Sequence, residues 1–220
     1  MKAFELLREG THFSGGVEVR VKKRIPLGGG MGGGSSDAAA TLKAVNQMFR
    51  LKLSPRRLHL FGLRLGADVP FFLAPYKSAV VTGIGEKIRV FSKINSFYFL
   101  LIFFPKELST RLVYETLGYD KLNKLTLQKT SVRISSAQLN LTTLEKLKQH
   151  CRNDLMRASF DLYPLTQKIY QFVSSQGYAV SQTGSGPTLF VAHKTKGPLL
   201  TLGRNVKRLF NLKTQITQSL

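Results

Sequence analysis

The sequence feature that most constrains this chain is a run of glycines at residues 28–34, where six of seven residues are glycine. Just before the run, residues 17–22 alternate valine with charged side chains, which predicts a strand with one buried face. After it, the residues from Ser35 onward carry apolar side chains at helical spacing. The sequence therefore predicts a strand, a glycine loop and a helix in direct succession.

A glycine loop at the start of a helix favours the binding of an anion. Glycine lets backbone amides approach a ligand closely, and the helix adds its unpaired N–H groups and its dipole at the same point. Glycine runs also form flexible linkers, but linkers do not normally lie tightly between a strand and an amphipathic helix. We therefore expect this loop to hold phosphates.

Two other kinds of phosphate loop fit the run poorly. A P-loop places lysine before the serine that opens the helix, and here Gly34 directly precedes Ser35. The spacing of a dinucleotide-binding loop is present, but the acidic residue expected about 20 positions later is absent between Asp37 and Asp68. That match is interpreted as accidental.

Asp68 and a second glycine loop are further candidates. Asp68 follows thirty residues that contain six basic residues and no acid, and it lies in a predicted turn (67–70) between a helix (54–66) and an apolar strand. Such a carboxylate can act as a base or orient a hydroxyl, although a structural turn aspartate is the alternative. Loop 183–187 is by itself an ordinary hairpin connection, but it could face the same cleft as the first loop.

The order of predicted elements indicates two halves and an α+β fold. A hairpin over 80–90, bent at its two glycines, completes the first half. With the extra helices set aside, the second half has the β-α-β-β-α-β order of a ferredoxin-like fold. Its predicted elements are strand 97–104, helix 110–117, a lysine-rich irregular stretch 120–133, a capping box at Thr142 and Glu145, a helix from Pro164 to Gly177, strands 178–182 and 188–193, helix 199–209 and a last strand.

Composition narrows the function classes only broadly. The net charge of +21 attracts polyanions, which include nucleic acid, anionic lipid and nucleotide phosphates, but the basic residues are spread along the chain without a basic tail. The longest strongly apolar run has eight residues (97–104), so we expect no membrane segment, and residues 1–10 lack a secretion signal. The single cysteine, Cys151, favours a reducing, cytoplasmic location, and the four histidines lack metal-ligand spacing.

Four segments resemble the GHMP kinases, and more closely their 4-diphosphocytidyl-2-C-methyl-D-erythritol kinase family. Residues 23–39 are similar to the phosphate loop of that family, and 65–72 to its catalytic segment. Asn153-Asp154-Leu155 matches a short later signature, and 183–187 matches the second glycine loop. The resemblance covers nearly the whole chain.

The resemblance implies phosphorylation by ATP of the 2-hydroxyl of a small substrate with a cytidine diphosphate group, in non-mevalonate isoprenoid (terpenoid) biosynthesis. Asp68 would be the catalytic base or hydroxyl-orienting group and would contact the substrate together with Thr183 and Gly184. Lys23 would lie beside the nucleotide, and Ser35 or Ser36 would help to place Mg²⁺. The ATP phosphates would be held by Pro26, Leu27, Gly28, Gly29, Gly30, Met31, Gly32, Gly33, Gly34, Ser35 and Ser36.

The resemblance also sets the expected domains. Residues 1–92 would form the N-terminal ATP-binding domain, related to domain 2 of ribosomal protein S5, and 93–220 the ferredoxin-like C-terminal domain. No segment before Val17 resembles the family's first motif, a Pro-x-Lys-x-Asn-type strand, so we expect an N-terminally truncated enzyme that lacks its first strands, the lysine and the cytidine pocket. The alternative is a non-catalytic GHMP-kinase remnant or a basic nucleic-acid-binding module.

Overall fold

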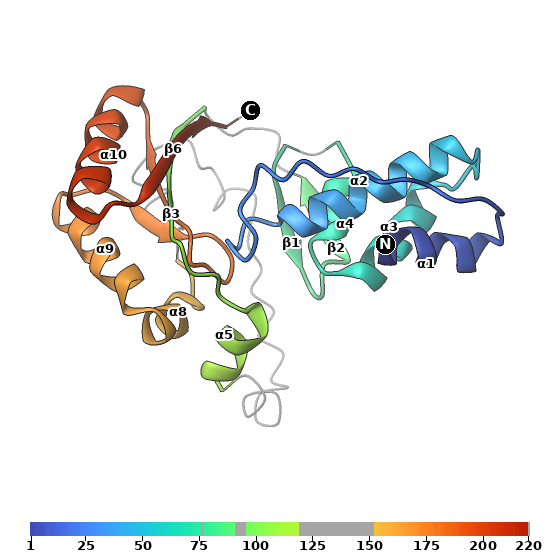
Figure 1. Ribbon diagram of the computed structural model, residues 1–220, viewed down its shortest axis with the longest axis horizontal. Helices are drawn as coiled ribbons and strands as arrows, with labels where there is room; N and C mark the ends of the chain where they lie inside the picture. Colours follow the sequence, from blue (N-terminus) through green and yellow to red (C-terminus); the bar gives the residue numbers. More distant parts are fainter. Residues whose placement is uncertain (76, 91–95, 119–151, 220) are drawn as a thin grey trace. The chain divides into compact units, whose positions relative to one another are not determined.

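The computed structural model describes residues 1–75, 77–90, 96–118 and 152–219, which form two compact units (Figure 1). The first unit contains Met1–Arg24 and Gly32–Ser92, and the second contains Ile25–Met31 and Lys93–Leu220. The chain therefore enters the second unit for the first part of the glycine run and returns to the first unit at Gly32.

Four helices and a hairpin make up the first unit (Figure 1). They are α1 (Lys2–Thr11), α2 (Gly33–Met48), α3 (Pro55–Leu65), α4 (Val69–Leu73), β1 (Ala79–Thr82) and β2 (Lys87–Val90). Their core contains Phe4 and Leu7 of α1, Leu42 and Val45 of α2, and Phe61 of α3. Because Leu42 and Val45 are three positions apart, they share one face of α2, as the predicted helical spacing requires.

Several predictions for this unit are confirmed. Ser54 caps α3 by accepting a hydrogen bond from the backbone N–H of Arg57 at 3.3 Å, Pro55 occupies the first turn, and the helix ends at Gly66. The predicted hairpin is formed by antiparallel pairing of β1 with β2, from Ala79 opposite Val90 to Thr82 opposite Lys87.

Two predicted strands are wrong. Residues 17–22 form no strand, and Val19 and Val21 are 43% and 52% exposed. A strand needs a neighbour to pair its backbone, and in the described part of the chain no strand pairs with this segment. The apolar strand predicted after the turn at Asp68 is instead helix α4, where Pro70 occupies the first turn and Val69 is buried against the helical core.

The second unit has the predicted ferredoxin-like order. Its elements are β3 (Tyr98–Phe103), α5 (Thr110–Thr116), α8 (Met156–Leu162), α9 (Pro164–Ser175), β4 (Val180–Gln182), β5 (Leu189–His193), α10 (Lys196–Phe210) and β6 (Lys213–Gln218). The four strands pair antiparallel in the order β4-β5-β3-β6. Helices α9 and α10 cover one face of this sheet, where Ile169 and Leu202 pack with Leu100 and Val191 (Figure 1).

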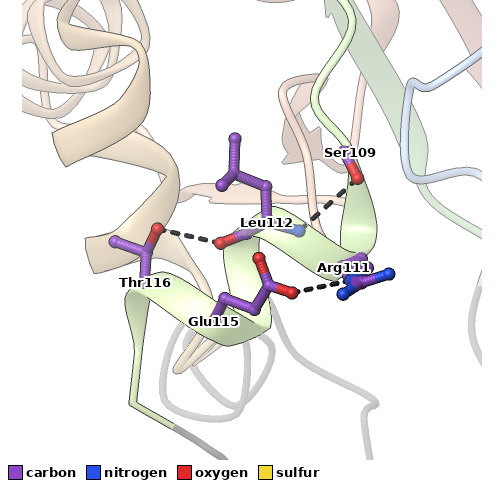
Figure 2. Close-up of polar contacts among 5 residues, drawn as sticks. All are labelled: Ser109, Arg111, Leu112, Glu115 and Thr116. Atoms are coloured by element: carbon purple, nitrogen blue, oxygen red, sulfur yellow. Dashed lines mark hydrogen bonds and ion pairs between the residues drawn. The ribbon is translucent and has the colours of Figure 1, made fainter.

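Helix α5 is fixed by local hydrogen bonds (Figure 2). Ser109 accepts from the backbone N–H of Leu112 at 3.4 Å, and Arg111 Nε donates to Glu115 Oε1 at 2.6 Å. Thr116 Oγ1 donates to the Leu112 carbonyl at 2.8 Å. The Ser109 bond caps the start of α5, and Thr110 of this helix contacts Ser185 of the second glycine loop.

Some predictions lie outside the described residues. They concern the lysine-rich stretch 120–133, the capping box at Thr142 and Glu145, and Cys151. Helices α1 and α8 were not predicted. Among the helices that the structure describes, none is both long and apolar enough to cross a membrane.

Candidate active site

The second part of the glycine run forms the start of α2 in the first unit. Gly32 is the N-cap residue, no side chain caps the helix, and the first turn contains no acidic residue. Ser36 N–H is the first to bond back, donating to the Gly32 carbonyl at 2.9 Å. The N–H groups of the preceding helical residues have no acceptor within the helix, so this end can receive an anion.

Lys23 lies beside the same helix. Its ammonium group donates to the carboxylate of Asp37, and both side chains are partly exposed. An ion pair with this exposure contributes little to stability. Its effect is to place a cation, Lys23, within reach of the first turns of α2.

Asp68 is exposed and forms the N-cap of the short helix α4, which packs against α2. At the other end of α4, the Phe72 ring lies against Gly32, where an added Cβ would be 3.0 Å from Phe72 Cε2. Lys43 of α2 donates to the Phe72 carbonyl at 3.1 Å. Within the first unit, the helix that begins at Asp68 therefore packs against α2 close to its start.

The turn of the β1-β2 hairpin supports the segment that carries Asp68. Gly85 is buried with φ +100°, and a Cβ on it would lie 2.0 Å from the carbonyl oxygen of Ala67. Backbone N–H groups of Glu86 and Ile84 donate to the Glu86 carboxylate and lower its pKa, with Lys87 and His59 adding to the effect. From the sequence, Gly83 and Gly85 were predicted only as bends of the hairpin. The local signal that this turn has a further role was Glu86, the acid that directly follows Gly85.

In the second unit, the first part of the glycine run contacts the second glycine loop. Thr183 Oγ1 donates to the Gly29 carbonyl at 2.8 Å. Gly30 has φ +70°, and a Cβ on it would lie 2.1 Å from the Thr183 carbonyl oxygen. A Cβ on Gly184 would lie 2.7 Å from the Gly30 carbonyl oxygen. The two loops are thus in direct backbone contact, although they are 154 residues apart.

The Thr183 hydroxyl has a second acceptor, the Thr188 carbonyl at 3.2 Å. A hydroxyl has one hydrogen to donate, so its donor is used within the loops and its oxygen lone pairs remain as acceptors. The substrate contact expected of Thr183 and Gly184 stays a prediction.

The start of α5 and the residues just before it contact the two loops. A Cβ on Gly28 would lie 2.7 Å from Glu107 Cβ, and Thr110 Oγ1 is hydrogen-bonded to Ser185 Oγ at 2.9 Å. Sequence reasoning missed Glu107 and Thr110, because neither lies in a recognisable motif.

The residues near α2 offer few ligands for a metal ion. No cluster of three or more His, Cys, Asp or Glu occurs in the described ranges, and the Asp37 carboxylate pairs with Lys23. Mg²⁺ in kinases is commonly held by one or two protein groups together with substrate phosphates. The Ser36 hydroxyl fits such a site only when a nucleotide supplies the phosphates.

The chain is similar to known proteins over most of its length. A family profile described as GHMP kinases N terminal domain matches residues 1–75. The chain is 37% identical over 191 residues to 4-diphosphocytidyl-2-C-methyl-D-erythritol kinase of Syntrophus aciditrophicus (strain SB), with 85% of this chain and 65% of the relative covered. It is 34% identical over 198 residues to the enzyme of that name from Persephonella marina (strain DSM 14350 / EX-H1), with 90% and 70% covered.

Solved structures show the same fold. A crystal structure of 4-(cytidine 5'-diphospho)-2C-methyl-D-erythritol kinase matches with a TM-score of 0.67 at 25% identity, covering 99% of this chain and 76% of that one. Homoserine kinase from Cytophaga hutchinsonii ATCC 33406 matches with a TM-score of 0.69 at 18% identity, covering 100% and 74%, and supports the fold alone.

The chain spans about two thirds of the length of the curated relatives it matches, from 65% to 70% in the two cases above. The curated relatives and the crystal structure of 25% identity agree on one group of enzymes. The predicted GHMP kinase fold is confirmed. The chain belongs to the 4-diphosphocytidyl-2-C-methyl-D-erythritol kinase family of the GHMP kinases.

Proposed function

We propose that this chain transfers the terminal phosphoryl group of ATP to the 2-hydroxyl of 4-diphosphocytidyl-2-C-methyl-D-erythritol, as a cytoplasmic step of isoprenoid biosynthesis. The observation that carries the proposal is the uncapped start of α2, packed against the helix that begins at Asp68, in a chain of this family. Residues 1–92 act as the ATP-binding domain and 93–220 as the C-terminal domain.

The glycine run holds the nucleotide. Residues 26–36 surround the phosphates, to which all of them except Pro26 can offer a backbone N–H, and the start of α2 contributes its positive dipole end. Lys23 adds a positive charge beside the same turns. When bound with the nucleotide, Mg²⁺ would neutralise charge on the phosphates, with the Ser36 hydroxyl as its protein ligand.

Asp68 acts on the acceptor hydroxyl. Its carboxylate takes the proton of the 2-hydroxyl, and the hydroxyl oxygen then bonds to the γ-phosphorus. At the same time the bond between that phosphorus and the β,γ-bridging oxygen breaks, and ADP leaves. Thr183 and Gly184 contact the substrate. Because phosphoryl transfer depends mainly on positioning and charge stabilisation, a glycine loop, a metal ion and one carboxylate form a chemically adequate set.

The test combines nucleotide binding with turnover. ATP should raise the melting temperature of the chain, since a ligand at 100 times its Kd stabilises the folded state by about 2.7 kcal/mol. With both substrates present, ADP should form. Asp68→Asn keeps the shape of the side chain but removes the base, so it should leave the Kd for ATP nearly unchanged and lower kcat by about 10² or more.

Two outcomes would contradict the proposal. Absence of ATP protection, together with steeply salt-dependent RNA binding, would favour the nucleic-acid-binding alternative. Near-normal turnover in Asp68→Asn would return Asp68 to a structural role at the start of α4.

A further inference from the structure

Asn153 has a side chain whose hydrogen bonds converge on the second glycine loop. It lies just before α8 and is partly buried. Its amide nitrogen donates to two backbone carbonyls, those of Gln182 at 2.9 Å and Gly184 at 2.8 Å. Its amide oxygen accepts from the N–H of Leu155 at 2.9 Å. Both amide hydrogens are therefore used on one loop.

The two carbonyls flank Thr183, where the chain leaves β4 and turns. The turn is closed by Gly186 N–H, which donates to the Thr183 carbonyl at 2.8 Å. Two carbonyls that face the same side chain need two donors, which the –NH₂ group of asparagine supplies. An aspartate in this position would present only lone pairs to them at neutral pH, although its shape is nearly the same.

The residues held in this way in turn hold the first glycine loop. Thr183 donates to the Gly29 carbonyl at 2.8 Å, and the Thr183 carbonyl and Gly186 nitrogen fill the space where a Cβ on Gly30 would lie. The position of Gly29 and Gly30 thus depends on the shape of residues 182–186. Asn153 contributes two hydrogen bonds to that shape, beside one from Gln182 Nε2 to the Gly184 carbonyl at 3.3 Å.

We propose that Asn153 is a positioning residue for nucleotide binding, which holds the second glycine loop in the shape that supports Gly29 and Gly30. It acts through the loops and does not itself contact the nucleotide. This inference rests on the proposed function, because it assumes that the first loop binds ATP. It gives a role to the Asn153-Asp154-Leu155 segment, which the proposed reaction otherwise leaves unused.

The test exchanges amide and carboxylate at two adjacent positions. Asn153→Asp removes both donors while keeping an oxygen for Leu155, whereas Asp154→Asn is the matched control. Asp154 lies on the surface, where its carboxylate pairs with Arg152 at 2.8 Å and both side chains are about four-fifths exposed. The Kd for ATP is measured by calorimetry at 25 °C, where circular dichroism confirms that each variant is folded.

Loss of two hydrogen bonds, each contributing about 1 kcal/mol net, should raise the Kd for ATP about 10- to 30-fold in Asn153→Asp. Asp154→Asn should bind ATP like the wild type. A purely structural role would lower the melting temperature of Asn153→Asp without changing the Kd of the folded protein, and that result would overturn the inference.

A second variant covers the case in which Asn153→Asp does not fold. Asn153→Ser keeps one donor and adds no charge, so its Kd should rise several-fold, and an unchanged Kd would overturn the inference equally. Failure of the wild type to bind ATP would instead overturn the proposed function, and this inference with it. Equal binding by the wild type and the Asn153 variants overturns this inference alone.

Discussion

Substitution of Gly30 by alanine tests the contact between the two glycine loops. The new Cβ would lie 2.1 Å from the Thr183 carbonyl oxygen and 2.8 Å from the Gly186 nitrogen, and φ is +70° at this position. The left-handed backbone costs a non-glycine residue about 1–2 kcal/mol, and overpacking typically costs about 1–3 kcal/mol. Because both neighbours are backbone atoms, we expect the loops to move apart at a total cost of roughly 2–5 kcal/mol.

The assay for Gly30→Ala separates folding from binding. Urea unfolding gives the loss of stability, and calorimetry gives the Kd for ATP, which should rise at least 10-fold. Gly177→Ala is the control, because Gly177 has φ +79° and is exposed, with no described atom within 4 Å of an added Cβ. That variant should lose only the backbone cost and should bind ATP normally. If Gly30→Ala matched Gly177→Ala in both measurements, the packing of the loops would not matter for binding.

Two further predictions concern the hairpin turn behind Asp68. Gly85→Ala should lower kcat with little change in the Kd for ATP, because the new Cβ would push on the Ala67 carbonyl next to Asp68. Steady-state kinetics measures kcat, and an unchanged value would contradict the prediction. The lowered pKa of Glu86 predicts that its contribution to stability is present above its ordinary pKa of 4.5 and is lost as the pH falls through the lower folded value. The melting temperature of Glu86→Gln should therefore depend less on pH in this acidic range than that of the wild type.

Local signals predicted most of the elements. Ser54-Pro55 and Gly66 gave the bounds of α3, and the apolar run 97–104 and the two segments that flank loop 183–187 gave three strands of the second half. These signals act over a few residues and depend little on distant packing. The same reasoning failed at residues 17–22, because alternation reports a possible buried face but not the partner that a strand needs.

The candidate site was predictable as a set of segments but not as an arrangement. The glycine run and Asp68 stand out in the sequence, yet nothing local indicates that Gly85 supports Ala67 or that Asn153 reaches Gln182 and Gly184. These contacts join residues 18 or more positions apart, and tertiary packing alone decides them. The division of the glycine run between two compact units is likewise invisible in a continuous stretch of glycines.

The structure also separates the reasons for glycine within the run. At Gly30, the Thr183 carbonyl oxygen leaves no space for a side chain, so packing within the chain is sufficient to explain glycine there. Gly34 lies in the first turn of α2, and no described atom would lie within 4 Å of an added Cβ. A glycine inside a helix costs about 1 kcal/mol relative to alanine. No contact within the described chain explains why residue 34 is glycine. Close approach of a phosphate group to the backbone of this turn would explain it, as the proposed function expects.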